Sequence, residues 1–284
     1  MHFVAEVFRF MDRIDKILSH HGFGSRKDVK KLLRDEQVFV NGKVIYDPGF
    51  QLDISKDVVL VSGQKIKLQK DLYIMMNKCR NVVCANRDGE HSTVFDLLDE
   101  SLRHNFLGGE LHCMGRLDID TEGLLILTTD GKLTHRLLSP KNHAPKTYAV
   151  ALRDSLTLEQ KQNYEAKFLK GFWIDHEGNE PGFNAQPAKI QFKKSSEETF
   201  SRDSNYNLFQ KNLFPENMPS VDKKIDCLLT IYEGKFHQVK RMFSQLGNEV
   251  VYLKRVKMGD LELDYSLEPG SYRELTAQEV ALLG

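Results

Sequence analysis

The chain has 284 residues, a length that fits one large domain or a small domain joined to a larger one. Its 40 basic and 40 acidic residues cancel, so any affinity for nucleic acid must come from an uneven distribution of charge. The absence of a long apolar run excludes a bilayer-spanning helix, and no signal peptide is evident, so we expect a cytoplasmic protein without membrane association.

The first predicted module spans residues 12–58, after an opening stretch (1–11) that we interpret as an N-terminal extension. Apolar residues at helical spacing predict one helix before Gly22 and a second helix after Ser25, which is a favourable N-cap. In the string VFVNGKVI, the pair Asn41-Gly42 predicts a tight turn between two short strands. These residues therefore predict a helix pair followed by a small β-element.

Basic side chains are concentrated in this module. Between Asp12 and Lys43, eight basic residues stand against five acidic ones. A solvated amphipathic helix would explain such charges without any partner. Their position near glycine-containing bends favours contact with phosphates, so we predict that they bind RNA. The predicted RNA-contacting residues here are Arg13, Lys16, Arg26, Lys27, Lys30, Lys31, Arg34 and Lys43.

Residues 59–71 are polar and rich in lysine, which predicts a linker or an edge strand. Residues 72–284 alternate short strands and helices, which predicts an α+β domain on an extended, mostly antiparallel mixed sheet flanked by helices. Within it, residues 193–222 are polar and lack periodicity, so we predict a surface insertion. The cysteines have neither CxxC pairing nor zinc spacing, and we expect four reduced thiols.

The most informative string is GRLDIDTEG, which ends at Gly123 and precedes the apolar run 124–127. An apolar run bounded by turn signals predicts a buried strand, so Asp118 is expected at the entrance to a core strand. Arg116 lies two residues before it. A fixed carboxylate beside a cation keeps a low pKa and stays ionised, which suits a nucleophile better than a general acid.

Two other interpretations of this string remain open. Asp118, Asp120, Glu122 and Gly123 copy the opening of a calcium loop, but Thr129 stands where the closing glutamate is needed. The string could also be a charged turn with no chemistry.

A second basic element is predicted in the string EGKFHQVKRMFSQLG, whose apolar residues recur at the spacing of an amphipathic helix. His237, Lys240 and Arg241 fall on the opposite face, and we predict that His237 and Arg241 contact RNA. A solvated helix face is the alternative. His237 is either a general base, because its free pKa is near neutrality, or a polar surface spacer.

Three strings in order, GRLDIDTEGLLILTTDGKLTHRLLSP, KTYAV and EGKFHQVKRMF, resemble the RsuA family of pseudouridine synthases. The string RIDKILSHHGFGSRKDVKKLL with VFVNGKVI resembles the S4 RNA-binding domain, which precedes the catalytic domain in that family. The resemblance runs from about Asp12 to the end of the chain. It implies an enzyme that isomerises uridine in RNA to pseudouridine without a metal or a cofactor.

The resemblance also implies roles for single residues. Asp118 matches the catalytic aspartate, Tyr148 the tyrosine that stacks on the target base, and Lys240 the basic residue that pairs with the aspartate. Arg116 matches an arginine thought to fill the space that the flipped base vacates. Cys79 departs from the pattern, since many relatives have a proline after Asn-Lys, but this affects a turn rather than the chemistry.

The chemistry explains these residue types. A uridine in folded RNA must be flipped into a pocket, and stacking on an aromatic ring such as Tyr148 offsets part of the cost. Asp118 would attack at C1′ of the ribose or at C6 of the base, and both remain open. Lys240 would hold the carboxylate ionised and aimed, and Tyr148 is a candidate for the base that removes the C5 proton.

The string HQVKRM and the compact C-terminal end resemble the small-subunit branch of the family, since large-subunit relatives often carry an NRQVRRM-like string. We therefore predict 16S rRNA as substrate and partner of a monomeric enzyme. The alternatives are a 23S rRNA pseudouridine synthase of the same family and a non-catalytic, S4-type RNA-binding factor for ribosome assembly.

Overall fold

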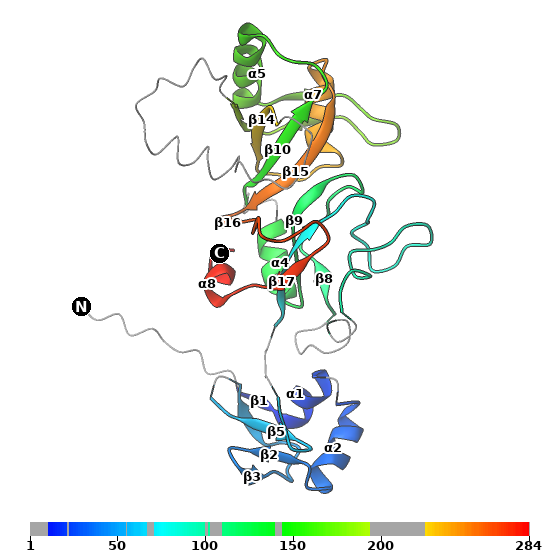
Figure 1. The fold of residues 1–284 in the computed structure, drawn as a ribbon, viewed down its shortest axis with the longest axis vertical. Helices are drawn as coiled ribbons and strands as arrows, with labels where there is room; N and C mark the ends of the chain where they lie inside the picture. Colours follow the sequence, from blue (N-terminus) through cyan, green and yellow to red (C-terminus); the bar gives the residue numbers. More distant parts are fainter. Residues whose placement is uncertain are drawn as a thin grey trace, which may run out of the picture. The chain divides into compact units, whose positions relative to one another are not determined.

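The structure is a computed structural model that describes residues 11–21, 23–54, 56–66, 71–99, 102, 110–139, 144–193 and 225–283 (Figure 1). The chain divides into two compact units, one built mainly from residues up to Tyr73 and the other from Ile74–Leu97, Cys113–Ile126 and the residues from Lys132 onward. Apart from Met11 and Lys193, the predicted extension and insertion lie outside the described residues. No helix in these ranges is long and apolar enough to cross a membrane.

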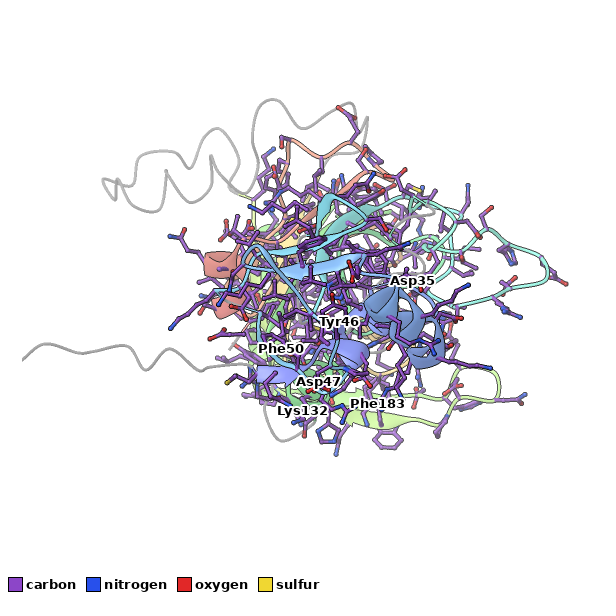
Figure 2. All side chains as sticks on the ribbon, turned by 90° about the horizontal axis from the view of Figure 1, so that it is seen from below. Asp35, Tyr46, Asp47, Phe50, Lys132 and Phe183 are labelled. Atoms are coloured by element: carbon purple, nitrogen blue, oxygen red, sulfur yellow. The ribbon has the colours of Figure 1, made fainter. Side chains whose placement is uncertain are left out.

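The first unit combines two helices with small antiparallel sheets. Its elements are β1 (Met11–Arg13), α1 (Ile14–His20), α2 (Arg26–Arg34), β2 (Val38–Val40), β3 (Lys43–Val44), β4 (Gln51–Asp53), β5 (Val59–Val61) and β6 (Gln64–Ile66). Ser25 caps α2 as predicted, in a reciprocal capping box with Asp28. The turn at Asn41 and Gly42 is also confirmed, since their φ values are 51° and 78°. Phe50, labelled in Figure 2, packs against the buried apolar cluster of this unit.

Of the two interpretations of residues 59–71, the edge strand is confirmed for β6 and the linker is wrong for residues 59–66. Residues 59–66 form the hairpin β5–β6, and the sheet runs in the order β3-β2-β5-β6, with β6 at its edge. Val59 and Val61 face the core, whereas Lys65 is exposed. The lysines of this segment therefore belong to the solvent face of a strand, which the polar composition concealed.

The second unit is built on a nine-stranded mixed sheet, in agreement with the predicted α+β class. Its order is β13-β14-β10-β15-β9-β7-β17, with β16 beside β15 and β8 beside β9. The strands are β7 (Tyr73–Lys78), β8 (His112–Cys113), β9 (Glu122–Thr128), β10 (Lys146–Leu152), β13 (Lys189–Phe192), β14 (Cys227–Ile231), β15 (Val250–Met258), β16 (Leu261–Glu262) and β17 (Tyr272–Glu274). Strands β9 and β15 run parallel, whereas β10 is antiparallel to both of its neighbours.

Helices and one hairpin accompany this sheet. They are α4 (Gly131–Leu138), α5 (Leu158–Lys170), the hairpin β11 (Phe172–Ile174) and β12 (Phe183–Ala185), α7 (Gln238–Gln245) and α8 (Ala277–Ala281). Helices α5 and α7 lie near β10 and β15 in Figure 1 and pack through aromatic rings, with the centroids of Phe168 and Phe243 5.3 Å apart. This packing fixes α7, whose first turn carries Lys240.

Candidate active site

The string GRLDIDTEG forms a loop that enters β9, and residues 124–127 of that strand are fully buried, as predicted. Gly123 has a φ of 100°, and a Cβ at this position would lie 2.2 Å from the carbonyl oxygen of Arg255. Only glycine therefore lets β9 approach β15 this closely. As a result, the loop that carries Asp118 is held by the central sheet at its exit.

A buried lysine holds the same loop. Lys78, at the end of β7, is fully buried. Its Nζ donates to the carbonyl oxygens of Cys79, Asp118, Ile119 and Thr121 at 3.0, 3.1, 3.3 and 2.9 Å. Burial lowers the pKa of Lys78. Sequence reasoning missed this residue, and its only signal was a lysine that ends an apolar run.

Lys240 bridges two carboxylates. Its Nζ lies 3.1 Å from Oδ2 of Asp118 and 2.6 Å from Oδ1 of Asp120. Burial lowers the pKa of Lys240, but the hydrogen bonds and charges of the two aspartates outweigh burial and leave this pKa raised. Burial likewise raises the pKa of Asp120, but the hydrogen bond and charge of Lys240, with smaller effects of a backbone hydrogen bond and of Arg80, together outweigh burial and lower this pKa. Asp120 thus anchors Lys240, a role that the sequence did not indicate.

The cation expected beside Asp118 was Arg116, and this prediction is wrong. Arg116 is exposed and, among the residues that the structure describes, forms no ion pair with Asp118. A separation of two residues does not bring two side chains together in a loop, because an irregular backbone can direct them to different sides. Lys240, distant in sequence, takes that place.

The calcium interpretation is also wrong. Asp118 and Asp120 both contact Lys240, whereas Glu122 accepts a hydrogen bond of 2.9 Å from the hydroxyl of Tyr252. The three carboxylates therefore do not converge on one point. Within the described ranges, no three His, Cys, Asp or Glu side chains are grouped so that they could hold a metal ion.

His237 lies beside Asp118, directly before α7, with a left-handed φ of 47°. Its Nε2 is 4.0 Å from Oδ1 of Asp118, and its Nδ1 is 3.5 Å from Oε2 of Glu177. The imidazole stacks on Phe236, with ring centroids 3.7 Å apart. Of the two interpretations of His237, this geometry favours a residue of the site over a surface spacer.

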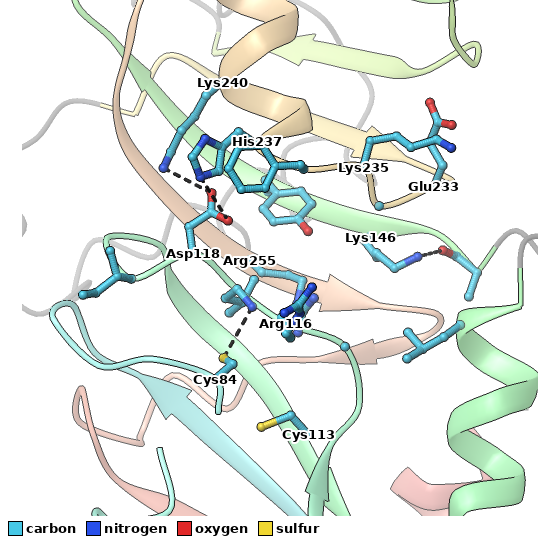
Figure 3. Close-up of a pocket in the computed structure, with 18 of the residues that line it drawn as sticks. Cys84, Cys113, Arg116, Asp118, Lys146, Glu233, Lys235, His237, Lys240 and Arg255 are labelled. Atoms are coloured by element: carbon cyan, nitrogen blue, oxygen red, sulfur yellow. Dashed lines mark hydrogen bonds and ion pairs between the residues drawn. The ribbon is translucent and has the colours of Figure 1, made fainter. Parts of the chain in front are cut away.

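Asp118, Asp120, His237 and Lys240 line one cavity of about 1190 Å³ (Figure 3). Figure 3 shows Asp118, His237 and Lys240 directed toward one another at its edge. Tyr148 lines the cavity from β10, where it is 8% exposed. Arg116 lines it from the loop. Ligand pockets commonly measure about 300–1000 Å³, so this cavity is large enough for a nucleotide.

The cavity also contains a pair of thiols, Cys84 and Cys113, and all four cysteines are free. A hydrogen bond between the two thiols lowers the pKa of Cys84 and raises that of Cys113. The backbone N–H of Leu117 also donates to Sγ of Cys84 at 3.4 Å. Cys84 therefore contacts the loop that carries Asp118, and both thiols line the cavity.

The basic residues predicted to contact RNA in the first unit lie mostly in the open. Arg26, Lys27, Lys30, Lys31 and Arg34 of α2 and Lys43 of β3 are exposed. Arg13 and Lys16, by contrast, form ion pairs with Asp15 and Asp12. The exposed cations of α2 are therefore the better supported part of the predicted RNA surface.

Arg241, predicted to contact RNA, is buried, and that prediction is wrong. The residue is 6% exposed, and its Nη2 donates to the carbonyl oxygens of Asp175 and Pro181 at 2.6 and 2.9 Å. Its guanidinium lies 4.8 Å from the ring centroid of Phe183, which is labelled in Figure 2. Arg241 instead ties α7 to the β11–β12 segment.

Residues 72–245 match the family model described as RNA pseudouridylate synthase, and residues 12–59 match the S4 domain. The chain belongs to the RNA pseudouridylate synthase family. An uncharacterized RNA pseudouridine synthase, YtzG, of Bacillus subtilis is 40% identical to this synthase over 272 residues, covering 95% of this chain and 98% of that protein.

Two further relatives cover nearly the whole synthase. Ribosomal small subunit pseudouridine synthase A of Haemophilus influenzae is 35% identical over 271 residues, or 95% of this chain and 99% of that protein. A crystal structure described as a pseudouridylate synthase is 33% identical, covers 96% of this chain and 99% of its own, and superimposes with a TM-score of 0.56. The synthase is therefore an enzyme that isomerises uridine in RNA and carries an S4 domain before its catalytic domain.

Proposed function

We propose that this synthase isomerises a specific uridine of 16S rRNA, with Asp118 as the nucleophile. The observation that carries the proposal is the position of the Asp118 carboxylate at the edge of the cavity, 3.1 Å from the ammonium of Lys240. The relatives that are named as ribosomal small subunit pseudouridine synthase A support 16S rRNA as the substrate.

In the proposed reaction the target nucleotide flips out of the RNA into the cavity, and its base stacks on Tyr148. Asp118 attacks either C1′ of the ribose or C6 of the base. The bond between C1′ and N1 breaks, the base turns, and C5 bonds to C1′. The bond between Asp118 and the nucleotide then breaks, and its electron pair returns to the carboxylate. The C5 proton then leaves and N1 gains a proton, so the product has the same atoms as the substrate and no electrons are exchanged.

Each neighbouring residue has a proposed part in this sequence. Lys240 keeps the Asp118 carboxylate charged and aimed, which is electrostatic preorganisation. Arg116 is proposed to enter the space that the flipped base leaves in the RNA, and its exposure and its place in the cavity lining support this part. Tyr148 is the candidate base for the C5 proton.

RNA binding by the S4 domain is proposed to rest on α2. Its five basic side chains are exposed, and no carboxylate of the described residues lies within ion-pair distance of them. Cations without intramolecular partners bind phosphates at a lower cost, because no existing ion pair has to break.

The test of the nucleophile is Asp118→Asn, which keeps the shape and removes the charge. We expect this variant to bind 16S rRNA transcript as the wild type does and to release no tritium from transcript labelled with 5-³H-uridine. Asp260→Asn is the matched control, because the Asp260 side chain is 83% exposed and distant in sequence from the cavity-lining loop. Substantial tritium release by Asp118→Asn would contradict the proposal.

The substrate is tested separately, by mapping pseudouridine in the rRNA of a strain that lacks this gene. We expect one pseudouridine of 16S rRNA to disappear and to return with the wild-type gene but not with Asp118→Asn. A missing pseudouridine in 23S rRNA would instead support the large-subunit alternative, and an unchanged map would support a non-catalytic assembly factor.

A further inference from the structure

Arg255 is a buried cation that lines the cavity and has one donor without a partner. It is 2% exposed, and it lines the same cavity as Asp118 and Tyr148. Its Nη2 is buried and has no hydrogen-bond partner among the residues that the structure describes. Buried polar atoms are almost always paired, so an unpaired donor on a side chain that lines a cavity indicates a ligand that supplies the missing acceptor.

The side chain is held in place for such a role. Arg255 lies in β15, directly opposite Tyr148 of β10, so the two side chains share one face of the sheet. Its Nε donates to the carbonyl oxygen of Leu124 at 2.8 Å. The close approach of Gly123 to the Arg255 backbone fixes the strand at this point. The guanidinium with the unpaired Nη2 therefore belongs to the residue paired with Tyr148, the ring on which the base is proposed to stack.

The surroundings indicate what kind of acceptor is missing. A guanidinium does not lose its proton in proteins, so its donors stay donors at every working pH. The hydrogen bond with Cys113 is the main cause that lowers the pKa of Cys84, and burial is the main cause for Lys146. The charge of Arg255 lowers both pKa values further, so both groups lie within its electrostatic reach. A hydrogen-bond acceptor is what remains to be supplied.

We propose that Arg255 reads the target base by donating a hydrogen bond from Nη2 to O4 of uracil. This inference rests on the proposed function, since it places the flipped uracil on Tyr148. Uracil carries an acceptor at position 4, whereas cytosine carries an amino donor there. With cytosine in the cavity, two donors would face each other without water, so Arg255 selects uridine against cytidine.

A phosphate is the other acceptor that a guanidinium commonly binds. The nearly complete burial of Arg255 disfavours it, because a phosphate at that depth would lose its whole hydration shell. A planar base that stacks on Tyr148 brings a neutral carbonyl to the same place at a smaller cost of desolvation.

The test uses nucleotide probes and requires no turnover. Dissociation constants are measured by calorimetry for uridine 5′-monophosphate, for cytidine 5′-monophosphate and for the pyrimidin-2-one analogue, which lacks O4. We expect the wild type to bind the uridine nucleotide roughly tenfold or more tightly than the other two, as one hydrogen bond to a charged donor provides. Equal binding of all three would overturn the proposal even if no variant folds.

The Arg255→Met variant should weaken binding of the uridine nucleotide by a similar factor and leave the other two nearly unchanged. The affinity of Arg255→Lys for the uridine nucleotide should lie between those of the wild type and of Arg255→Met. Lys146→Met is the matched control: Lys146 is another buried cavity cation, but its Nζ already donates to the carbonyl oxygen of Ala144 at 2.9 Å. We expect it to change all three affinities by one common factor.

Two outcomes distinguish base reading by Arg255 from phosphate binding and from the proposed role of Asp118. If Arg255→Met weakens all three nucleotides equally and leaves binding of free uridine unchanged, Arg255 holds the phosphate and the proposal is overturned. If Asp118→Asn still releases tritium while the preference for uridine depends on Arg255, the nucleophile assignment fails and the base-reading role stands.

Discussion

The ammonium of Lys78 donates a hydrogen bond of 3.1 Å to the carbonyl oxygen of Asp118. The bond is to the backbone and not to the carboxylate, so Lys78 positions the peptide from which the nucleophile projects. Its other bonds reach three further carbonyl oxygens around the same loop. One buried charge thereby replaces the regular backbone hydrogen bonds that a loop lacks.

We expect Lys78→Met to reduce kcat about 100-fold, because a nucleophile displaced by even about 1 Å loses about that much rate. The free energy of unfolding should also fall by about 1–3 kcal/mol, since four carbonyl oxygens lose a shared donor. Tritium release and urea unfolding measure the two effects. Lys167→Met, on the exposed face of α5, is the control and should change neither. Normal kcat in a folded Lys78→Met protein would show that the loop needs no such support.

The charges around Lys240 predict how stability depends on pH. Its folded pKa is raised above 10.5, so its contribution is fully present below pH 10.5 and is lost as the pH rises through the folded value. The pKa of Asp120 is lowered from 3.8, so its contribution is present above pH 3.8 and is lost as the pH falls through the folded value.

We therefore expect the difference in unfolding free energy between the wild type and Lys240→Met to stay constant from about pH 5 to about pH 9. The difference should shrink on either side of that window. Urea unfolding of both proteins across the range is the measurement, with Lys167→Met as the control for a lost surface charge. A difference that changed with pH inside that window would contradict these charge assignments.

The burial of Arg241 leads to a different prediction from the one that its sequence position suggested. We expect Arg241→Met to lower the free energy of unfolding by about 3 kcal/mol, because two carbonyl oxygens lose a charged donor. The salt dependence of RNA binding should remain that of the wild type. A flatter salt dependence in a folded Arg241→Met protein would restore Arg241 to the RNA surface.

Removing basic side chains from α2 is expected to change the salt dependence of RNA binding without lowering stability, the reverse of the expectation for Arg241. The double change Lys30→Ala, Lys31→Ala should leave stability within about 0.5 kcal/mol of the wild type, because both side chains are exposed. The slope of log affinity against log salt should flatten by about 0.7 for each RNA phosphate that the variant no longer neutralises. Lys167→Ala, Lys170→Ala removes two exposed lysines from α5 as the charge-matched control. An equal slope in both double variants would count against α2 as the RNA surface.

Sequence reasoning succeeded where a local rule determines the structure. The cap at Ser25, the turn at Asn41 and the buried run after Gly123 each depend on a few neighbouring residues. Spacing alone failed where the partner is distant in the chain. It placed Arg116 beside Asp118, whereas the ion pair is made by Lys240, 122 residues away, as the family resemblance implied. Packing of the second unit brings α7 to that position.

The burial of charged side chains was the second feature that the sequence did not reveal. Lys78, Arg241 and Arg255 are all charged residues inside the protein, and each donates hydrogen bonds to backbone carbonyl oxygens. Carbonyl groups leave no mark in a sequence, so a lysine or arginine of this kind looks identical to one on the surface. The hairpin β5–β6 has a different cause: its exposed polar side chains made a linker and an edge strand equally compatible with the composition.

The close contact between Gly123 of β9 and the backbone of Arg255 in β15 limits which substitutions could change the proposed base preference of this enzyme. The strand that carries the nucleophile loop touches the strand of Arg255 with no room for a methyl group. A change at position 255 that shifted its backbone would therefore also displace Asp118. A change of preference toward another pyrimidine therefore requires a substitution that alters side-chain atoms at position 255 and leaves the backbone of β15 in place. A variant that moves this backbone would lose catalytic activity as well as selectivity.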